Sequence, residues 1–307
     1  MRLLFALVVL VFLGTFAPLR LQKPEPVPAV TILTFEAAGP EEKRIGRLTF
    51  LEGWNIESDD LRFGGLSTLH VEDGAVLAFS DSGLSIRFPL PRGGPVRAEI
   101  SPLPNGPGTA SAKADRDVEA MVVLGPLAWI AFERANQVWR YHRDGWRSDS
   151  SASPAAMREW RGNRGSEAMV RLPDGRFLIL SEGDGGEALL FSGDPAVKGT
   201  PWRALKYRPP EGYLITDAAV LPDGRLLFLN RSAGITGFSA KLSLGRFADE
   251  QDRAAITGEE IATLDGLDNL EGLSVTQEEG RTIVWLASDD NFNPLQRTLL
   301  LKFALEL

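Results

Sequence analysis

Short apolar runs separated by turns dominate the hydrophobic pattern of the chain. Residues 167–182 and 217–231 each contain an acidic residue, an apolar strand, a Pro-Asp-Gly turn and a second apolar strand. Proline sets φ at such a turn, and glycine accepts the positive φ that closes it. Each of the two segments is therefore predicted to form a β-hairpin.

This hairpin pattern repeats along the chain, at intervals of about fifty residues. The same outline returns at residues 64–67, 119–121 and 271–273. Further strand-like runs, such as residues 137–142 and 187–191, lie between the hairpins and give about four strands to each repeat. Radially repeated four-stranded sheets form a β-propeller, so we predict an all-β propeller.

The two ends of the chain are predicted to close the ring. Residues 298–305 supply only a third strand to the last repeat, and residues 46–54 are a free strand that could complete it. Five hairpins favour five blades, while the additional run at residues 30–35 leaves a six-bladed arrangement open. A two-domain β-sandwich is the alternative architecture.

The amino terminus resembles an export signal. Arg2 precedes an apolar run over residues 3–13 that continues to Phe16, and the small-residue positions of a cleavage site are poorly formed. A cleaved signal peptide and a retained anchor through residues 3–19 therefore both stay open. We expect a periplasmic or extracellular protein, either free or tethered to the inner membrane.

The domain boundary is predicted to follow this segment. Three alternating prolines at residues 24–28 indicate an extended linker. We divide the chain into a signal or anchor (1–22), a linker with a lead-in strand (23–42) and a propeller domain (43–307).

The amino-acid composition excludes several classes of binding and catalytic site. The chain has 307 residues and a net charge of −8, which disfavours a sequence-independent grip on nucleic acid. It contains no cysteine and only two histidines, His70 and His142, which excludes thiolate chemistry and cysteine-based zinc sites. Ser67 opens a strand rather than a helix, so a nucleophile elbow is unsupported. We expect a monomer that acts on a small molecule.

Acidic residues open and close the predicted hairpins, and the inner strand of a propeller blade starts near the axis. The opening set is Glu119, Glu167, Asp217 and Glu271, and the closing set is Asp81, Glu133, Glu182, Asn230 and residues 289–291, with Arg231 as a competing match for Asn230. Carboxylates gathered around one axis repel one another and call for a cation. Oxygen-only ligands suit Ca²⁺ or Mg²⁺.

Arginines accompany these acids, and the guanidinium fork suits carboxylates and phosphates. They are Arg62, Arg116, Arg134, Arg164, Arg231 and Arg297. A channel mouth lined by both signs could hold a cation on its acids and an anionic ester on its arginines, with a metal-activated water as nucleophile. Equally, the arginines could pair with the acids and leave the mouth inert.

Several motifs resemble the phytase-like, esterase-like family of bacterial exported propellers over about residues 43–307. They lie at residues 63–67, 117–120, 132–134, 165–168, 221–224, 268–272, 285–292 and 296–303. The resemblance implies a β-propeller with phosphoesterase or esterase activity, and it matches the family's acidic and arginine positions to Glu119, Glu133, Glu167, Glu271, Asp289, Asp290 and Arg297. Asn230 and Arg231 occupy the position at which the family resemblance leads us to expect Glu followed by Arg. The basic-rich channel of calcium-dependent phytases is missing, so phytate is not the expected substrate.

The leading hypothesis is an exported, metal-assisted hydrolase of a small anionic ester. Its catalytic residues are Glu119, Glu167 and Glu271; its ligands for a Ca²⁺-like ion are Glu119, Glu167, Asp217, Glu271 and Asp289; its substrate-binding residues are Arg134, Arg297 and Arg231. Two alternatives remain open. One is a lactonase-type hydrolase with a single axial divalent metal, and the other is a non-catalytic envelope module that binds a carbohydrate or a protein.

Overall fold

A computed structural model describes residues 27–160, 164–183, 186–234, 237–247 and 256–307 of the chain. The predicted signal or anchor segment (1–22) and the first part of the predicted linker lie outside these ranges. Within them, no helix combines the length and the apolar character that a membrane span requires.

The described strands form five antiparallel units of four strands. The first unit consists of β4 (Leu66–Glu72), β5 (Ala75–Ser80), β6 (Leu84–Pro89) and β7 (Val96–Pro102). The second consists of β8 (Val118–Leu124), β9 (Leu127–Phe132), β10 (Gln137–His142) and β11 (Arg147–Ala152). The third consists of β12 (Ser166–Arg171), β13 (Phe177–Ser181), β14 (Glu187–Phe191) and β15 (Trp202–Arg208). The fourth consists of β16 (Leu214–Val220), β17 (Leu226–Gly234), β18 (Gly237–Gly245) and β20 (Glu259–Asp265). The fifth consists of β21 (Leu270–Glu278), β22 (Arg281–Ser288), β23 (Thr298–Leu305) and β3 (Leu48–Glu57).

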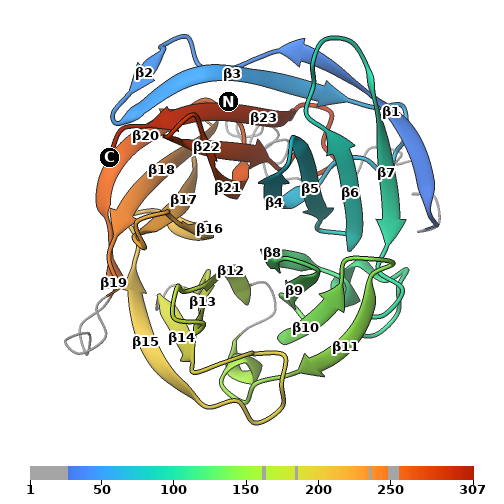
Figure 1. Ribbon diagram of the computed structural model, residues 1–307, viewed down its shortest axis with the longest axis vertical. Coiled ribbons are helices and arrows are strands. Elements are labelled where there is room, and N and C mark those ends of the chain that lie inside the picture. The colour runs from blue at the N-terminus through green and yellow to red at the C-terminus, as the bar shows by residue number, and fades with distance from the viewer. Residues whose placement is uncertain (1–26, 161–163, 184–185, 235–236, 248–255) are drawn as a thin grey trace, which may run out of the picture.

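These units surround a common centre (Figure 1), which confirms the predicted all-β propeller and rules out the β-sandwich. The inner strands β4, β8, β12, β16 and β21 contact one another in sequence around the ring, and β21 returns to β4. The two Pro-Asp-Gly hairpins are confirmed, because β12 pairs with β13 and β16 pairs with β17. Their turn glycines, Gly175 and Gly224, both have positive φ.

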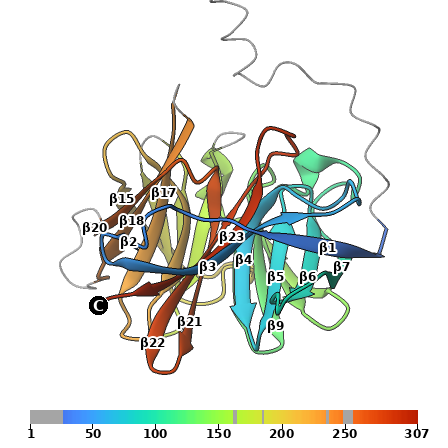
Figure 2. The same cartoon turned by 90° about the horizontal axis from the view of Figure 1, so that it is seen from above.

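Ring closure follows the prediction. β3 pairs antiparallel with β23, and Gly53 lies opposite Leu301, so a strand from near the amino terminus completes the last unit. The predicted lead-in strand is β1 (Ala29–Ala37), which pairs with β3 on one edge and β7 on the other. It joins the outer strands of the last and first units rather than starting a sheet of its own (Figure 2).

The remaining described elements are small. β2 (Arg44–Ile45) pairs with β3, and β19 (Ile256–Thr257) adds a short parallel strand to β15. Two 3₁₀ turns, η1 (Lys113–Asp115) and η2 (Met157–Glu159), lie in the connections before β8 and before β12. Only η1 bears on the candidate site, because it places a lysine at the channel mouth.

The hydrophobic core is divided among the junctions between neighbouring units. Five buried clusters occur in the described chain, one for each junction. Phe79 and Phe132 join the first two units, and Trp285 packs with Ile86 across the closure. Because the second strands β5, β9 and β13 are buried on both faces, they read as continuous apolar runs, whereas the outer strand β11 has exposed positions in alternation. This packing holds the five inner strands in equivalent positions around the axis.

Candidate functional site

Each inner strand has a β-bulge near its start, and the bulge selects the side chain that reaches the channel mouth. The residues that the bulges leave without a cross-strand partner are Ser67, Glu119, Glu167, Thr216 and Glu271. A bulge twists the strand and re-aims one side chain. Three glutamates from three units therefore occupy equivalent positions, close enough to influence one another electrostatically.

The two bulge residues that are not acidic join neighbouring units. The hydroxyl of Ser67 donates a hydrogen bond to the backbone oxygen of Val118, and the hydroxyl of Thr216 donates to that of Leu270 at 3.4 Å. Both acceptors lie in the inner strand of the next unit. Ser67 is thus a structural residue, as its place in the sequence predicted.

A second set of equivalent residues lies on the second strand's side of each hairpin, directly after the residue that pairs with the inner strand just before its bulge. The strand register aligns Asp81, Glu133, Glu182, Arg231 and Asp289 at this position. Four members are acids, and the fourth unit alone contributes an arginine. Of the two alternatives left open by the sequence, Arg231 is the equivalent residue. Asn230 pairs with the residue just before the bulge, as Ser80 does in the first unit, and Arg231 follows it as Asp81 follows Ser80.

Asp217 lies one residue beyond the bulge and does not join the glutamates. Its Oδ1 accepts a hydrogen bond from the backbone N–H of Ala218 at 2.8 Å, and its Oδ2 accepts one from Leu273 at 2.7 Å. Burial raises the pKa of Asp217 well above its usual value, and these two hydrogen bonds lower it in part. The predicted ligand role of Asp217 is therefore replaced by a structural one: it ties β16 to β21.

We expect the substitution Asp217→Asn to lower the free energy of unfolding by about 1–3 kcal/mol, because the amide would direct an N–H at a backbone donor. Urea unfolding with and without Ca²⁺ checks this. The stabilisation that Ca²⁺ confers should be the same in the variant and in the wild type. If the substitution left the cation-free stability intact and removed the Ca²⁺ effect, Asp217 would be a ligand after all.

Arg231 neutralises one sector of the mouth. Its guanidinium contacts Glu271 at 2.6 Å, Glu182 at 3.1 Å and the side-chain oxygen of Asn269 at 2.5 Å. Glu182 and Glu271 belong to the two units that flank Arg231. We therefore remove Arg231 from the predicted substrate-binding set, because it serves as an internal counter-ion between carboxylates.

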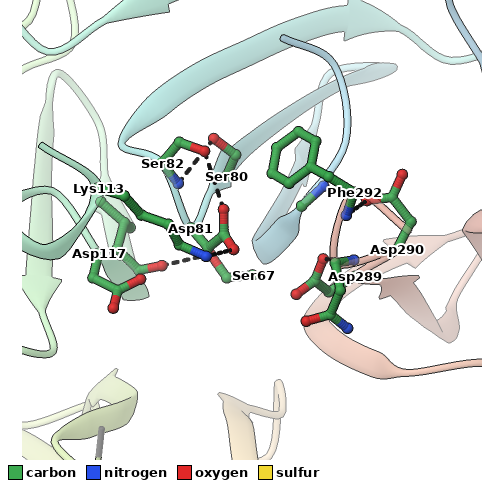
Figure 3. Close-up of polar contacts among 12 residues, drawn as sticks. Ser67, Ser80, Asp81, Ser82, Lys113, Asp117, Asp289, Asp290 and Phe292 are labelled. Carbon is green, nitrogen blue, oxygen red and sulfur yellow. Dashed lines mark hydrogen bonds and ion pairs between the residues drawn. The ribbon is translucent and has the colours of Figure 1, made fainter. Parts of the chain in front are cut away.

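Lys113 neutralises a second sector and was missed by the sequence reading (Figure 3). It comes from η1, on the connection between β7 and β8, and its ammonium group forms an ion pair with Asp81. The nearby charges of Asp81, Asp117 and Asp289 raise its pKa, although burial opposes them as the largest single effect. No sequence pattern marks this lysine, since it lies in a connection rather than in a repeat.

The remaining sector gathers carboxylates that could hold a cation. Among the described residues, two groups of three have oxygens within 4.8 Å of one another: Asp117, Glu119 and Glu133, and Glu133, Glu167 and Glu182. Glu133 belongs to both groups. Glu271 and Asp289, two of the predicted ligands, belong to neither. The geometry thus keeps Glu119 and Glu167 as candidate ligands and adds Asp117, Glu133 and Glu182.

The charge state of these groups fits a cation site. Burial raises the pKa of Glu133 to about 7, and a hydrogen bond from the backbone N–H of Gly165 opposes the shift. Burial and the charges of neighbouring carboxylates raise the pKa values of Glu119 and Glu167 well above the usual range. A divalent cation would replace the protons that such a cluster otherwise retains. An all-oxygen, anionic donor set suits Ca²⁺ or Mg²⁺.

The two other predicted substrate-binding arginines lie at the surface. Nε of Arg134 donates to Asp117 at 2.6 Å, and Nε of Arg297 donates to Asp268 at 2.7 Å. About half of each side chain is exposed, 48% and 47% respectively. Of the two, only Arg134 contacts a member of the carboxylate groups.

The end of the channel opposite the acidic mouth forms a cavity with several apolar side chains in its walls. A cavity of about 240 Å³ there is lined by all five inner strands, and its walls include Met121, Val170, Ala219 and Val275. His70 also lines this cavity and hydrogen-bonds Glu72. The clustered carboxylates lie at the other end, the acidic mouth, while this cavity has His70 and Arg171 among its lining residues.

Comparison with known proteins places this arrangement in a family. Residues 61–292 match the model of a family described as "Phytase-like: Esterase-like activity of phytase". The chain belongs to the phytase-like family. The matched range includes the candidate ligands from Asp117 to Glu182, and it supports a hydrolase-type propeller.

No curated protein matches this phytase-like chain. Among solved structures, an exo-1,5-α-L-arabinanase from a bovine ruminal metagenomic library is similar, with a TM-score of 0.50 and 13% identity over 78% of this chain and 95% of that one. A glutaminyl cyclase from Myxococcus xanthus has a TM-score of 0.49 and 11% identity over 85% of this chain and 97% of that one. At such identities the arabinanase similarity concerns the fold alone.

Proposed function

We propose that this phytase-like propeller is a metal-assisted hydrolase of small anionic esters. The observation that carries the proposal is the ion pair between Arg134 and Asp117. Asp117 belongs to the carboxylate group that suits a cation, and Arg134 keeps half of its side chain exposed beside it. A cation and an anion-binding guanidinium would then lie next to each other.

Asp117, Glu119 and Glu133 are the residues proposed to hold the cation. A divalent cation in such a position supplies Lewis-acid activation of an ester oxygen and of water. Arg134 orients the anionic group of the substrate, and Arg297 is a second half-exposed guanidinium, paired with Asp268. Arg231 holds Glu182 and Glu271 in place and opposes the rise in their pKa values that burial causes.

Glu167 is proposed to accept and return the proton during hydrolysis. Its carboxylate lies within 4.8 Å of that of Glu133, and its pKa is raised by burial and by the charges of Glu182 and Glu133. A raised pKa lets a buried carboxyl group take up a proton as well as release one, as general acid–base catalysis requires.

The apolar segment at residues 3–16 extends the proposal to location. It would direct the protein across the inner membrane, and either cleavage or retention would leave the propeller on the far side. A small ester substrate would then be met outside the cytoplasm.

The experiment is hydrolysis of p-nitrophenyl phosphate, p-nitrophenyl acetate and a δ-lactone by the wild type, each with Ca²⁺, Mg²⁺ or Mn²⁺ and with a chelator. We expect cation-dependent cleavage of p-nitrophenyl phosphate, the anionic ester of the three, and a loss of about 100-fold or more in Glu167→Gln. Cleavage of the lactone alone would select the lactonase-type alternative.

The matched control is Glu259→Gln. Glu259 is exposed and pairs with Arg47 on an outer strand, so its amide variant should retain full activity. Wild-type activity that is insensitive to chelator, or that Glu167→Gln leaves unchanged, would contradict the proposed mechanism. Absence of all three activities would favour a non-catalytic binding module.

A further inference from the structure

The loop between β22 and β23 begins at the acidic mouth and presents two apolar side chains. It spans residues 289–297 and carries Phe292, which is half-buried, and Leu295, which is 82% exposed. Leu295 has the largest exposed fraction of any large hydrophobic side chain in the described ranges. A single exposed leucine is ordinary on a loose loop. This loop, however, is closely held.

Hydrogen bonds fix the loop at successive residues. The backbone N–H groups of Asn291, Phe292 and Leu295 donate to the side chains of Asp289, Asp290 and Asn293, at 2.6, 2.9 and 3.1 Å. The backbone N–H of Asn293 also donates to the backbone oxygen of Asp290 at 2.7 Å. The position of Leu295 is therefore set by the loop, and its exposure is built in.

Asp290 attaches this loop to the first unit. Its Oδ1 also accepts a hydrogen bond from the backbone N–H of Gly65 at 2.7 Å, and its Oδ2 accepts one from the hydroxyl of Thr298 at 3.2 Å. Both oxygens are thus occupied by structural contacts. Asp290, which the family resemblance matched to an acidic position, acts here as a positioning residue for Phe292 (Figure 3).

The ring of Phe292 is placed over the first unit's side of the mouth. Phe292 has φ of +50°, a conformation that is costly for a bulky residue. A Cβ at Gly65 would clash with this ring and would lie 2.9 Å from Oδ1 of Asp81. The glycine leaves room for the ring to pack close to the acidic mouth.

We propose that Phe292 and Leu295 form an apolar wall that binds the hydrocarbon group of the substrate. This inference rests on the proposed function and names its substrate class: an anionic ester that carries an aryl or alkyl group, rather than a polyphosphorylated polyol. The anionic group would bind beside Arg134, and the hydrocarbon group would bury apolar surface against the wall.

The first test is direct binding, which needs no turnover. Calorimetry with Ca²⁺ present compares phenylphosphonate with methylphosphonate, two anions that differ in their hydrocarbon group. We expect the wild type to bind phenylphosphonate about tenfold more tightly. In Phe292→Gly and in Leu295→Ser this preference should fall to about threefold or less, while the affinity for methylphosphonate stays unchanged.

Two features separate a binding role from a structural one. Glycine is free to adopt the positive φ at position 292, so Phe292→Gly should fold without a large loss of stability. Trp202→Ala removes an exposed aromatic side chain (41%) on the outer strand β15 and should leave the phenyl preference intact. Equal loss of both phosphonates in Phe292→Gly, or no phenyl preference in the wild type, would overturn the proposal.

The hydrolase proposal can fail independently of the wall. If the wild type binds phenylphosphonate with the expected preference but hydrolyses none of the esters, the apolar wall stands and the catalytic role is lost. If it hydrolyses p-nitrophenyl phosphate and shows no preference between the phosphonates, the catalytic role stands and the wall is wrong.

Discussion

Replacing Arg231 by methionine is expected to lower the free energy of unfolding by about 3–5 kcal/mol at pH 7.5 in the absence of divalent cations. The guanidinium is the charged partner of both Glu182 and Glu271. Its removal leaves two largely buried carboxylates, 15% and 14% exposed, beside further acids, and the loss of one partner from such an ion pair is costly. Urea unfolding followed by fluorescence measures the difference.

The effect of Arg231→Met should depend on pH. At pH 5, Glu182 and Glu271 can take up protons in place of the missing guanidinium, so the loss should be markedly smaller. A loss that is equal at pH 5 and pH 7.5 would show that Arg231 contributes packing rather than charge.

Arg225→Met is the matched control. Arg225 lies in the same hairpin and pairs with Asp223 at 2.6 Å, but Asp223 is largely open to solvent. Such pairs contribute about 0–1 kcal/mol. If Arg231→Met were as mild as Arg225→Met at pH 7.5, the guanidinium would not be the counter-ion of the mouth.

Without divalent cations, the protein is expected to be most stable near pH 5 and to lose several kcal/mol of stability between pH 5 and pH 8. The pKa of Glu133 is about 7 in the folded protein, against a reference value of 4.5. The folded state therefore binds the proton more tightly, and the free energy of unfolding falls as the pH rises from about 4.5 to about 7. At about 1.4 kcal/mol per pKa unit, Glu133 alone contributes about 3 kcal/mol.

Carboxylates with lowered pKa values determine how the stability of the protein falls at acidic pH. The pKa of Asp60 is lowered by its hydrogen bond from Arg62, and that of Asp149 is lowered by Arg140. Carboxylates of this kind stabilise the fold above their unfolded pKa, and this stabilisation is lost as the pH falls below it. Stability should therefore also decline below about pH 4.

Divalent cations should reduce the loss of stability that is expected between pH 5 and pH 8. A cation that binds only the folded state adds about 2.7 kcal/mol at a hundredfold excess over its Kd. Because protons and the cation compete for the same carboxylates, Ca²⁺ should stabilise the protein more at pH 8 than at pH 5. Thermal unfolding at both pH values, with and without Ca²⁺, gives the comparison.

Glu133→Gln should remove much of the slope between pH 5 and pH 8, together with much of the Ca²⁺ effect. Glu259→Gln, on the exposed outer strand, should retain both. Stability that rises from pH 5 to pH 8 in the absence of cations would contradict the electrostatic account of the mouth.

Local patterns were sufficient for the architecture. The Pro-Asp-Gly turns and the apolar runs on either side of them are short-range signals, and they correctly placed the hairpins β12–β13 and β16–β17. The free strand at residues 46–54 and the incomplete last repeat predicted the pairing of β3 with β23. Such features follow from backbone geometry and burial, which neighbouring residues largely determine.

Local sequence patterns were less successful in predicting which residues lie at the mouth. Aligning acids by spacing put Asp217 beside Glu119 and Glu167, although the bulge in β16 makes Thr216 the equivalent residue. A shift of one residue in a strand changes the face on which a side chain lies. The spacing between motifs does not report a bulge, so the sequence could not distinguish the two positions.

The amino-acid sequence by itself determined that this chain forms a propeller with carboxylates and arginines at one mouth, because repeated turns and apolar strands encode that placement locally. Only the tertiary structure decided which of these charges neutralise one another. Arg231 bridges acids from two neighbouring units, and Lys113 reaches Asp81 from a connection. Charge pairing depends on distances of a few ångströms between segments far apart in the chain, and packing of the sheets sets those distances.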